Sequence, residues 1–256
     1  MDLYVVGCHG GETTKHRTCA FVIDEVLALD AGSVTSGLDL AAQARLEACV
    51  VSHAHLDHVR DLATLADNRC QMGLPPLVIA GTRGTLAALR AHFFNNVLWP
   101  DFTAIPSVTE PTIRFQELEP ERTAVIAGFS VKPVLVNHSI ESAGFVITSP
   151  TGGALGYSGD TGPTDRLFEV LNEERDLRAL LMEVSFPERE RRVALASGHH
   201  TPGTLAVDLR KLRTPRELPT LLYHIKPYFQ AEVERECAAI EGHNLQVLEL
   251  EDQFVL

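Results

Sequence analysis

The stretch that most constrains this chain is residues 50–59, which read Val-Val-Ser-His-Ala-His-Leu-Asp-His-Val. Three histidines and an aspartate fall within six positions, directly after an apolar run that predicts a buried strand. Imidazole and carboxylate are ligands that Zn²⁺ and related metals prefer. The two-residue spacing of His53 and His55 directs both rings the same way, and Asp57 and His58 follow where a helix is expected to enter, within reach of a second ion. A histidine-rich surface loop is the alternative, which this dense spacing disfavours.

One loop cannot complete two metal sites, so further ligands are expected at the ends of other strands. His138, Asp160 and His224 each follow an apolar run that predicts a strand. Taken alone, each is more often an ordinary residue that caps a turn or bonds to the backbone. Together with the first motif they supply seven nitrogen and oxygen ligands, as two adjacent ions need. The sequence therefore predicts two divalent metal ions, with zinc as the default and manganese or iron as alternatives.

Apolar runs and turn residues predict a β-rich chain with helices in both halves. The expected strands are Leu3–Val6, Ala20–Ile23, Val26–Asp30, Ala48–Val51, Leu77–Ala80, Phe129–Val136, Gly144–Thr148, Ala154–Ser158, Ala179–Val184, Thr220–Tyr223 and Leu245–Leu248. The expected helices are Val59–Arg69, Thr82–Phe94, Asp165–Glu174, Thr204–Leu212 and Ala231–Glu241. Four prolines indicate an irregular segment at Asn95–Glu121. This order predicts sheets packed together with helices outside, in a single domain over residues 1–256.

Composition limits the partners and the compartment. No apolar run approaches the ~20 residues that span a bilayer, and the N-terminal residues lack the features of a signal peptide, so we expect a cytoplasmic protein without membrane partners. The five cysteines are widely spaced and odd in number, which predicts reduced thiols. The net charge of −12 disfavours nucleic acid as a partner. A small anionic substrate remains compatible, because metal ions reverse the field within one cleft.

The ligand pattern resembles that of the metallo-β-lactamase fold superfamily, and the resemblance covers nearly the whole chain. Other segments resemble its class II cyclic-nucleotide phosphodiesterases, above all Trp99-Pro100 and the run Glu183-Val184-Ser185-Phe186. The resemblance implies the α/β (α+β) class, as a four-layer αββα sandwich. It also divides the predicted ligands between two ions that share one bridging residue: His53, His55 and His138 for the first ion, Asp57, His58 and His224 for the second, and Asp160 between them.

The same resemblance implies catalytic roles. Asp57 would serve catalysis as well as metal binding, and His199 would protonate the leaving alkoxide, with Glu183 orienting its ring. His200 stands where the family carries an apolar residue, so the sequence leaves open whether His199 or His200 faces the cleft. The alternative interpretation makes Glu183 a strand-end carboxylate and the histidine pair part of a helix entry capped by Thr201.

The function that this resemblance implies is metal-dependent hydrolysis of a 3′,5′-cyclic nucleotide, cyclic AMP or cyclic GMP, to the nucleoside 5′-monophosphate. A transfer-RNA 3′-processing endonuclease of the same fold is a close alternative, although such nucleases usually carry a basic arm that is not visible here. A thioester or lactam hydrolase and a redox di-iron protein are weaker alternatives, as is a non-catalytic metal-dependent binding module. The base, the metal and the oligomeric state stay open. The aromatic segment Phe93–Phe102 is a candidate dimer surface or purine platform, with core packing as the alternative.

Overall fold

Two β-sheets of seven strands each form the centre of the molecule in the computed structural model, which describes residues 1–214 and 216–256. The first sheet contains β1 (Asp2–Gly7), β2 (Ala20–Ile23), β3 (Leu27–Leu29), β4 (Ala48–Val51), β5 (Leu77–Gly81), β6 (Ile113–Glu117) and β14 (Gln253–Val255), in the order β14-β1-β2-β3-β4-β5-β6. The second contains β7 (Ala124–Ile126), β8 (Phe129–Leu135), β9 (Ala143–Thr148), β10 (Ala154–Tyr157), β11 (Leu177–Glu183), β12 (Pro219–Tyr223) and β13 (Asn244–Val247), in the order β13-β12-β11-β10-β9-β8-β7. Each half of the chain thus builds one sheet, and only β14 returns to the first.

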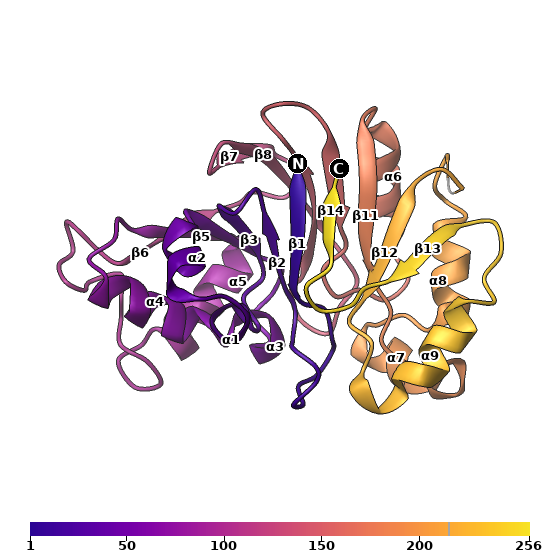
Figure 1. Ribbon diagram of the computed structural model, residues 1–256, viewed down its shortest axis with the longest axis horizontal. Coiled ribbons are helices and arrows are strands. Elements are labelled where there is room, and N and C mark those ends of the chain that lie inside the picture. Colours follow the sequence, from indigo (N-terminus) through magenta and orange to yellow (C-terminus); the bar gives the residue numbers. More distant parts are fainter. Residues whose placement is uncertain (215) are drawn as a thin grey trace.

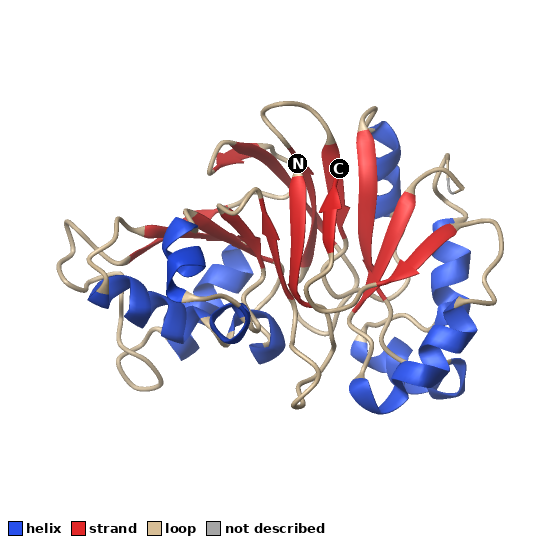
Figure 2. Cartoon of the chain, in the orientation of Figure 1, coloured by secondary structure: helices blue, strands red, loops and turns tan. Residues whose placement is uncertain are grey.

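Short helices cover the outer face of each sheet. Those of the first half are α1 (Val34–Gly37), α2 (Leu40–Arg45), α3 (Leu56–Val59), α4 (Leu62–Gln71) and α5 (Arg83–Ala88), which continues as a π-helical turn at Leu89–Phe93. Those of the second half are α6 (Arg166–Glu173), α7 (Arg191–Ser197), α8 (Pro202–Leu209) and α9 (Gln230–Cys237), with 3₁₀ turns at Glu188–Glu190 and Pro227–Phe229. Figures 1 and 2 show helices on both outer sides of the paired sheets, which confirms the predicted four-layer sandwich. In the described part of the chain, no helix has the length and apolar character needed to cross a bilayer.

The main apolar core lies between the two sheets. Successive side chains of a strand point to opposite faces, so the inward residues of both sheets form one layer. Phe21 on β2 is fully buried there and meets Tyr157 of β10 and Tyr223 of β12 edge-on, with ring centroids 5.8 and 5.3 Å apart. These aromatic contacts join the first sheet to the second directly beneath the strand ends that carry the candidate site.

Replacing Phe21 by alanine is expected to lower the free energy of unfolding by about 3–5 kcal/mol, because it leaves a cavity between the sheets. Denaturant unfolding followed by circular dichroism measures this effect. Val125 on β7 is 67% exposed and provides a matched control, since its replacement by alanine should change stability by less than about 0.5 kcal/mol. Equal effects of the two replacements would contradict the central position of Phe21.

The expected helix Val59–Arg69 is divided into α3 and α4, so the prediction of one continuous helix is wrong. The loop after β3 forms hydrogen bonds with the backbone at the break. The amide of Ala31 donates to the carbonyl of His58 at 2.7 Å, and the amide of Asp61 donates to the carbonyl of Ala31 at 2.9 Å. These long-range hydrogen bonds replace helical ones and hold the loop after β3 against α3.

The segment Asn95–Glu121 was expected to be irregular, but it contains β6, and that part of the prediction is wrong. Ile113 and Phe115 alternate with polar residues, as a half-buried strand requires. The prolines upstream obscure this short pattern. The strand forms because it pairs in parallel with β5, where Ile113 stands opposite Leu77.

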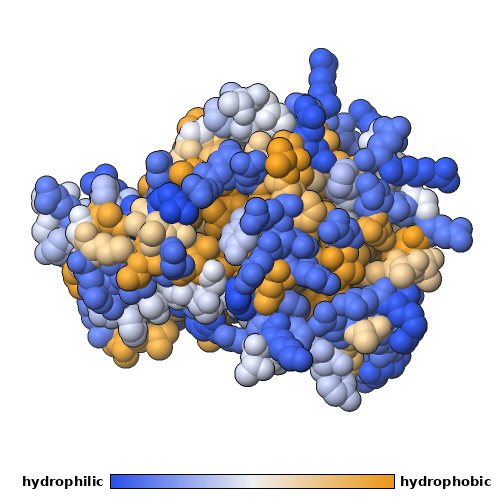
Figure 3. Space-filling model, in the orientation of Figure 1, coloured by the Kyte–Doolittle hydropathy of each residue, from blue (hydrophilic) through white to orange (hydrophobic). Residues whose placement is uncertain are grey.

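The aromatic segment beside β6 belongs mostly to the core. Phe93, Phe94 and Phe102 are buried between the first sheet and its helices, which confirms core packing for these three rings. The exposed apolar residues of the segment are Val97 and Leu98, with exposed fractions of 90% and 59%. Figure 3 shows apolar and hydrophilic residues interspersed over the face in view, as is normal for a folded protein. The dimer surface in this segment stays a prediction of the sequence.

Candidate metal centre

The candidate site lies where parallel strands of both sheets end. In the first sheet β3 and β4 are parallel, and in the second β10, β11 and β12 are parallel. Strand β8 runs in the same direction as β10, because both pair antiparallel with β9. Their carboxyl ends therefore meet at one edge of the sandwich. The polar residues at or after these ends are Asp30 (β3), His53 (β4), His138 (β8), Asp160 (β10), Glu183 (β11) and His224 (β12).

The predicted ligands gather in two clusters. In the first cluster, Nδ1 of His55 lies 3.0 Å from Nε2 of His53 and 3.2 Å from Nε2 of His138. The second cluster consists of Asp57, His58, Asp160 and His224. Within each cluster all the ligand atoms lie within 4.8 Å of one another. The structure thus brings together all seven residues that the sequence proposed.

Asp160 lies between the two clusters and is almost completely buried. Its Oδ2 is 3.1 Å from Nε2 of His224 and 3.2 Å from Nε2 of His58, which belong to the second cluster. The same oxygen is 3.7 Å from Nε2 of His53 in the first cluster. A single carboxylate therefore contacts both groups of rings, as a bridging ligand requires.

A buried carboxylate behind the site, Asp30, orients two of the rings. It accepts a hydrogen bond from Nδ1 of His58 at 2.7 Å. It also accepts one from the hydroxyl of Ser52 at 2.7 Å, and that hydroxyl in turn accepts from Nδ1 of His53 at 3.0 Å. The amide of Ser52 and the hydroxyl of Tyr157 complete its partners, at 2.7 and 2.5 Å. Asp30 thus holds one ring of each cluster, one directly and one through a serine.

Glu183 is a second buried carboxylate that, like Asp30, orients two of the histidine rings around the clusters. Its Oε2 accepts from the hydroxyl of Ser185 at 2.9 Å, and that hydroxyl lies 2.8 Å from Nδ1 of His224. Its Oε1 lies 3.3 Å from Nδ1 of His199. Again one buried carboxylate reaches one ring directly and another through a serine. Outer partners of this kind fix the tautomer and the orientation of metal-binding histidines.

These contacts test whether the residues fit metal ions. The outer nitrogens of His53, His58, His138 and His224 are engaged by Ser52, Asp30, the carbonyl of Gly198 and Ser185, so their inner nitrogens face one another as lone-pair donors. The Oδ1 atom of Asp160 is buried and has no hydrogen-bond partner among the described residues. Facing lone pairs and an orphaned carboxylate oxygen are costly without a cation. The buried His/Asp clusters are consistent with a dinuclear metal site.

Electrostatics agree with this fit. Burial lowers the pKa of His53 well below its usual value and that of His224 to about 4, so both rings stay neutral at pH 7. Burial also disfavours the charged form of His58, but Asp160 and Asp30 outweigh it and raise the pKa of this ring. A cation that binds there therefore displaces a proton.

The structure also distinguishes His199 from His200. The ring of His199 lies 5.0 Å from that of His138 and 5.1 Å from that of His224, between centroids, so it faces both clusters. The ring of His200 is fully buried on the other side, with Nδ1 3.0 Å from the hydroxyl of Thr204. Thr201 caps α8, as the sequence indicated. His199 is therefore the ring that reaches the site.

A glycine makes this placement of His199 feasible. Gly198 ends α7 with φ of +72°, a conformation that other residues rarely adopt. A Cβ atom at this position would lie 2.7 Å from Cα of His138. The close approach allows the carbonyl of Gly198 to accept from Nδ1 of His138 at 2.9 Å.

Comparison with known proteins places this architecture in a family. Residues 29–225, well over half of the chain, match the family model described as Beta-lactamase superfamily domain. The chain belongs to the metallo-beta-lactamase superfamily. This confirms the superfamily expected from the ligand motif, and the matched span contains all seven clustered residues.

Relatives within the metallo-beta-lactamase superfamily include phosphodiesterases. A probable 3′,5′-cyclic-nucleotide phosphodiesterase of Yersinia pestis is 26% identical, over 90% of this chain and 79% of that protein. The structure of unliganded yeast PDE1 superposes with a TM-score of 0.80 at 18% identity, covering 98% of both chains. Human tRNase Z, short form, superposes with a TM-score of 0.72 at 18% identity, covering 100% of this chain and 99% of that one. The two structures establish the likeness of fold. The superfamily match together with the buried His/Asp clusters indicates a metal-dependent hydrolase.

Sequence reasoning missed the residues that support the clusters, namely Asp30, Ser52, Tyr157 and Ser185. Asp30 carried a usable signal, because it is the last residue of a predicted strand, and His138 and Asp160 closely follow theirs. Ser52 and Ser185 lie within quoted segments, but nothing in those segments indicated their contacts, and Tyr157 carried no signal. Their roles depend on contacts across the sandwich that spacing along the chain does not reveal.

Replacing Asp30 by asparagine is expected to weaken metal retention by about 10–100-fold, the usual cost of removing a partner behind a metal-binding histidine. The amide can no longer accept all four hydrogen bonds, so His58 and Ser52 lose their common acceptor. Competition of the purified protein with a chromogenic chelator measures this affinity. The exposed Asp39, which caps α2, provides an aspartate-to-asparagine control away from the site.

Proposed function

We propose that this protein is a dinuclear metal-dependent phosphodiesterase that hydrolyses 3′,5′-cyclic nucleotides to nucleoside 5′-monophosphates. The observation that carries the proposal is the ring of His199, held by Glu183 beside two clusters of ligand atoms. This arrangement suits a reaction in which a leaving oxygen must be protonated. Sequence similarity to a probable cyclic-nucleotide phosphodiesterase over 90% of the chain supports the substrate class.

The seven clustered residues bind the metal in this proposal, with zinc as the default ion. His53, His55 and His138 would hold one ion, and Asp160 would serve both. Asp57, His58 and His224 would hold the other ion. When bound, two such ions polarise a phosphoryl oxygen and lower the pKa of a water molecule.

The proton is supplied by His199. Its Nδ1 faces Glu183 and Ser185, at 3.3 and 3.2 Å, which leaves Nε2 to deliver a proton to the leaving oxygen. Glu183 is fully buried and fixes the ring in this orientation. The sugar hydroxyl that leaves on opening of a cyclic phosphodiester is a poor leaving group without this proton.

The mouth of the site suits a small anion. Asp57 and His55 are partly exposed, so the clusters open to solvent on this side. Lys226 lies there with Nζ 4.0 Å from Oδ2 of Asp57. A cation in this position attracts a phosphodiester toward the metal clusters, although the chain as a whole is acidic.

Turnover of four substrates by metal-loaded protein tests the proposal: cyclic AMP, cyclic GMP, bis-p-nitrophenyl phosphate and a precursor transfer RNA. Release of nucleoside 5′-monophosphate from a cyclic nucleotide, abolished by a chelator and restored by zinc, is the expected result. Comparison of the first two substrates identifies the preferred base. If neither cyclic nucleotide is hydrolysed, the proposed substrate class is wrong. If bis-p-nitrophenyl phosphate is not hydrolysed either, the proposal of phosphodiester hydrolysis is wrong.

A transfer-RNA 3′-processing nuclease is the second candidate, because human tRNase Z has the same fold. That likeness, at 18% identity, carries no information about the substrate. The net charge of −12 opposes binding of a long polyanion. Cleavage of the precursor RNA with inert cyclic nucleotides would establish this candidate instead.

A further inference from the structure

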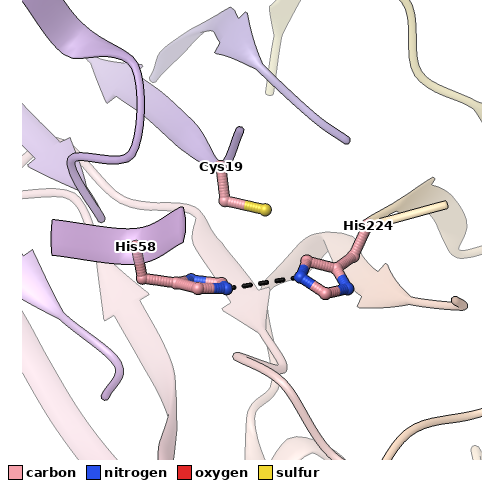
Figure 4. Close-up of side chains that lie close together, drawn as sticks. All are labelled: Cys19, His58 and His224. Carbon is pink, nitrogen blue, oxygen red and sulfur yellow. Dashed lines mark hydrogen bonds between the residues drawn. The ribbon is translucent and has the colours of Figure 1, made fainter. Parts of the chain in front are cut away.

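A cysteine lies among the ligands of the second cluster. Cys19 directly precedes β2 and is fully buried. Its Sγ lies within 4.8 Å of ligand nitrogens of His58 and His224, and these two rings are themselves 3.4 Å apart at Nε2. Figure 4 shows the thiol beside the line that joins the two rings, with its sulfur directed toward the space between them. The group belongs neither to the seven clustered residues nor to the contacts of His199.

The carboxylate of Asp160 independently indicates a ligand at the same place. Its Oδ2 lies 3.2 Å from Nε2 of His58 and 3.1 Å from Nε2 of His224, the two rings next to the thiol. Its Oδ1 is buried without a hydrogen-bond partner among the described residues. The thiol itself has a weak contact, 3.8 Å from Sγ to the carbonyl of His9. Two ring nitrogens, a carboxylate and a thiol therefore converge on one small volume.

We propose that Cys19 is a sulfur ligand of the metal ion held by the second cluster. The inference rests on the metal-binding part of the proposed function and does not depend on the substrate. Zinc binds sulfur at ~2.3 Å and nitrogen at ~2.0–2.1 Å, so sulfur and nitrogen ligands of one ion lie about 3.5 Å apart. The ligand atoms of Cys19, His58 and His224 all lie within 4.8 Å of one another, which is compatible with this separation. The ion takes the place of the thiol proton, which passes to solvent.

The charge of the clusters makes such a ligand useful. Two divalent ions bring four positive charges, whereas the seven clustered residues include two carboxylates, Asp57 and Asp160. A thiolate from Cys19 would offset a third charge from the buried side of the site. A sulfur ligand also favours zinc or cadmium over manganese or magnesium, which prefer oxygen. The second cluster is therefore the more thiophilic of the two.

Cadmium titration of the metal-free protein tests the inference without an activity assay. A cadmium–thiolate bond gives a charge-transfer absorption in the ultraviolet that histidine and carboxylate ligands do not produce. We expect this absorption to saturate with one of two bound ions in the wild-type protein and to be absent from Cys19→Ser. The variant should still bind two ions, with affinity for one of them reduced at least about tenfold.

Cys49 provides the matched control. It is fully buried on β4, in the core between the first sheet and its helices, so Cys49→Ser should retain the absorption. X-ray absorption at the zinc edge of the wild-type protein needs no variant, and should detect a sulfur neighbour at ~2.3 Å. Two bound ions without charge-transfer absorption or a sulfur neighbour would overturn the role of Cys19 and leave the proposed function intact. A protein that binds no metal would overturn both.

Discussion

Replacing Asp160 by asparagine is expected to lower kcat/KM for a phosphodiester by at least about a thousandfold. Its Oδ2 contacts Nε2 of His224, His58 and His53, so one substitution removes a charge from both clusters. Asparagine keeps the shape of the side chain but loses half of its acceptor capacity. The loss should appear in steady-state kinetics together with a metal content below two ions per chain, measured by mass spectrometry.

Asp165 is the control for this prediction. Its side chain is 82% exposed and contacts Lys211, so Asp165→Asn should leave both activity and metal content close to those of the wild type. Full activity of Asp160→Asn with one ion per chain would contradict a mechanism that uses both clusters. The thermal midpoint of each variant shows whether the fold survives the substitution.

Replacing His199 by alanine is expected to lower kcat for a cyclic nucleotide by about 10²–10⁴-fold, the range for loss of a general acid. The effect should depend on the leaving group. Nitrophenolate leaves without a proton, so the same variant should lose less than about tenfold in activity on bis-p-nitrophenyl phosphate. Parallel assays of the two substrates measure this difference directly.

His200 is the neighbouring control, because its ring packs against Thr204 and Asp208 and does not face the clusters. The variant His200→Asn should affect both substrates equally, through stability. Equal losses of activity on both substrates for His199→Ala would exclude the proton-donor role. The ring would then act in substrate binding or in the structure of the site. If the ratio of the activity on the cyclic nucleotide to the activity on bis-p-nitrophenyl phosphate stays at its wild-type value in His199→Ala, the proton-donor role is likewise excluded.

Much of the fold could be predicted because local pattern was sufficient there. Ala48–Val51 and Phe129–Leu135 are apolar or alternating runs bounded by turns, and both runs form strands. The break between α3 and α4 could not be predicted in this way. It depends on backbone hydrogen bonds to Ala31, which lies in a different loop. The strand β6 likewise forms because β5 offers it a partner.

The sequence by itself determined which residue types stand at the strand ends, and the spacing of His53 and His55 placed two of them side by side. Tertiary structure alone decided how they meet. His58 and His224 are separated by 166 positions yet lie 3.4 Å apart at Nε2, because the two sheets pack face to face. The same packing selected His199 over His200, and it brought Cys19 beside the second cluster. Spacing along a chain constrains direction over a few residues, whereas contact between distant strands depends on the packing of the whole core.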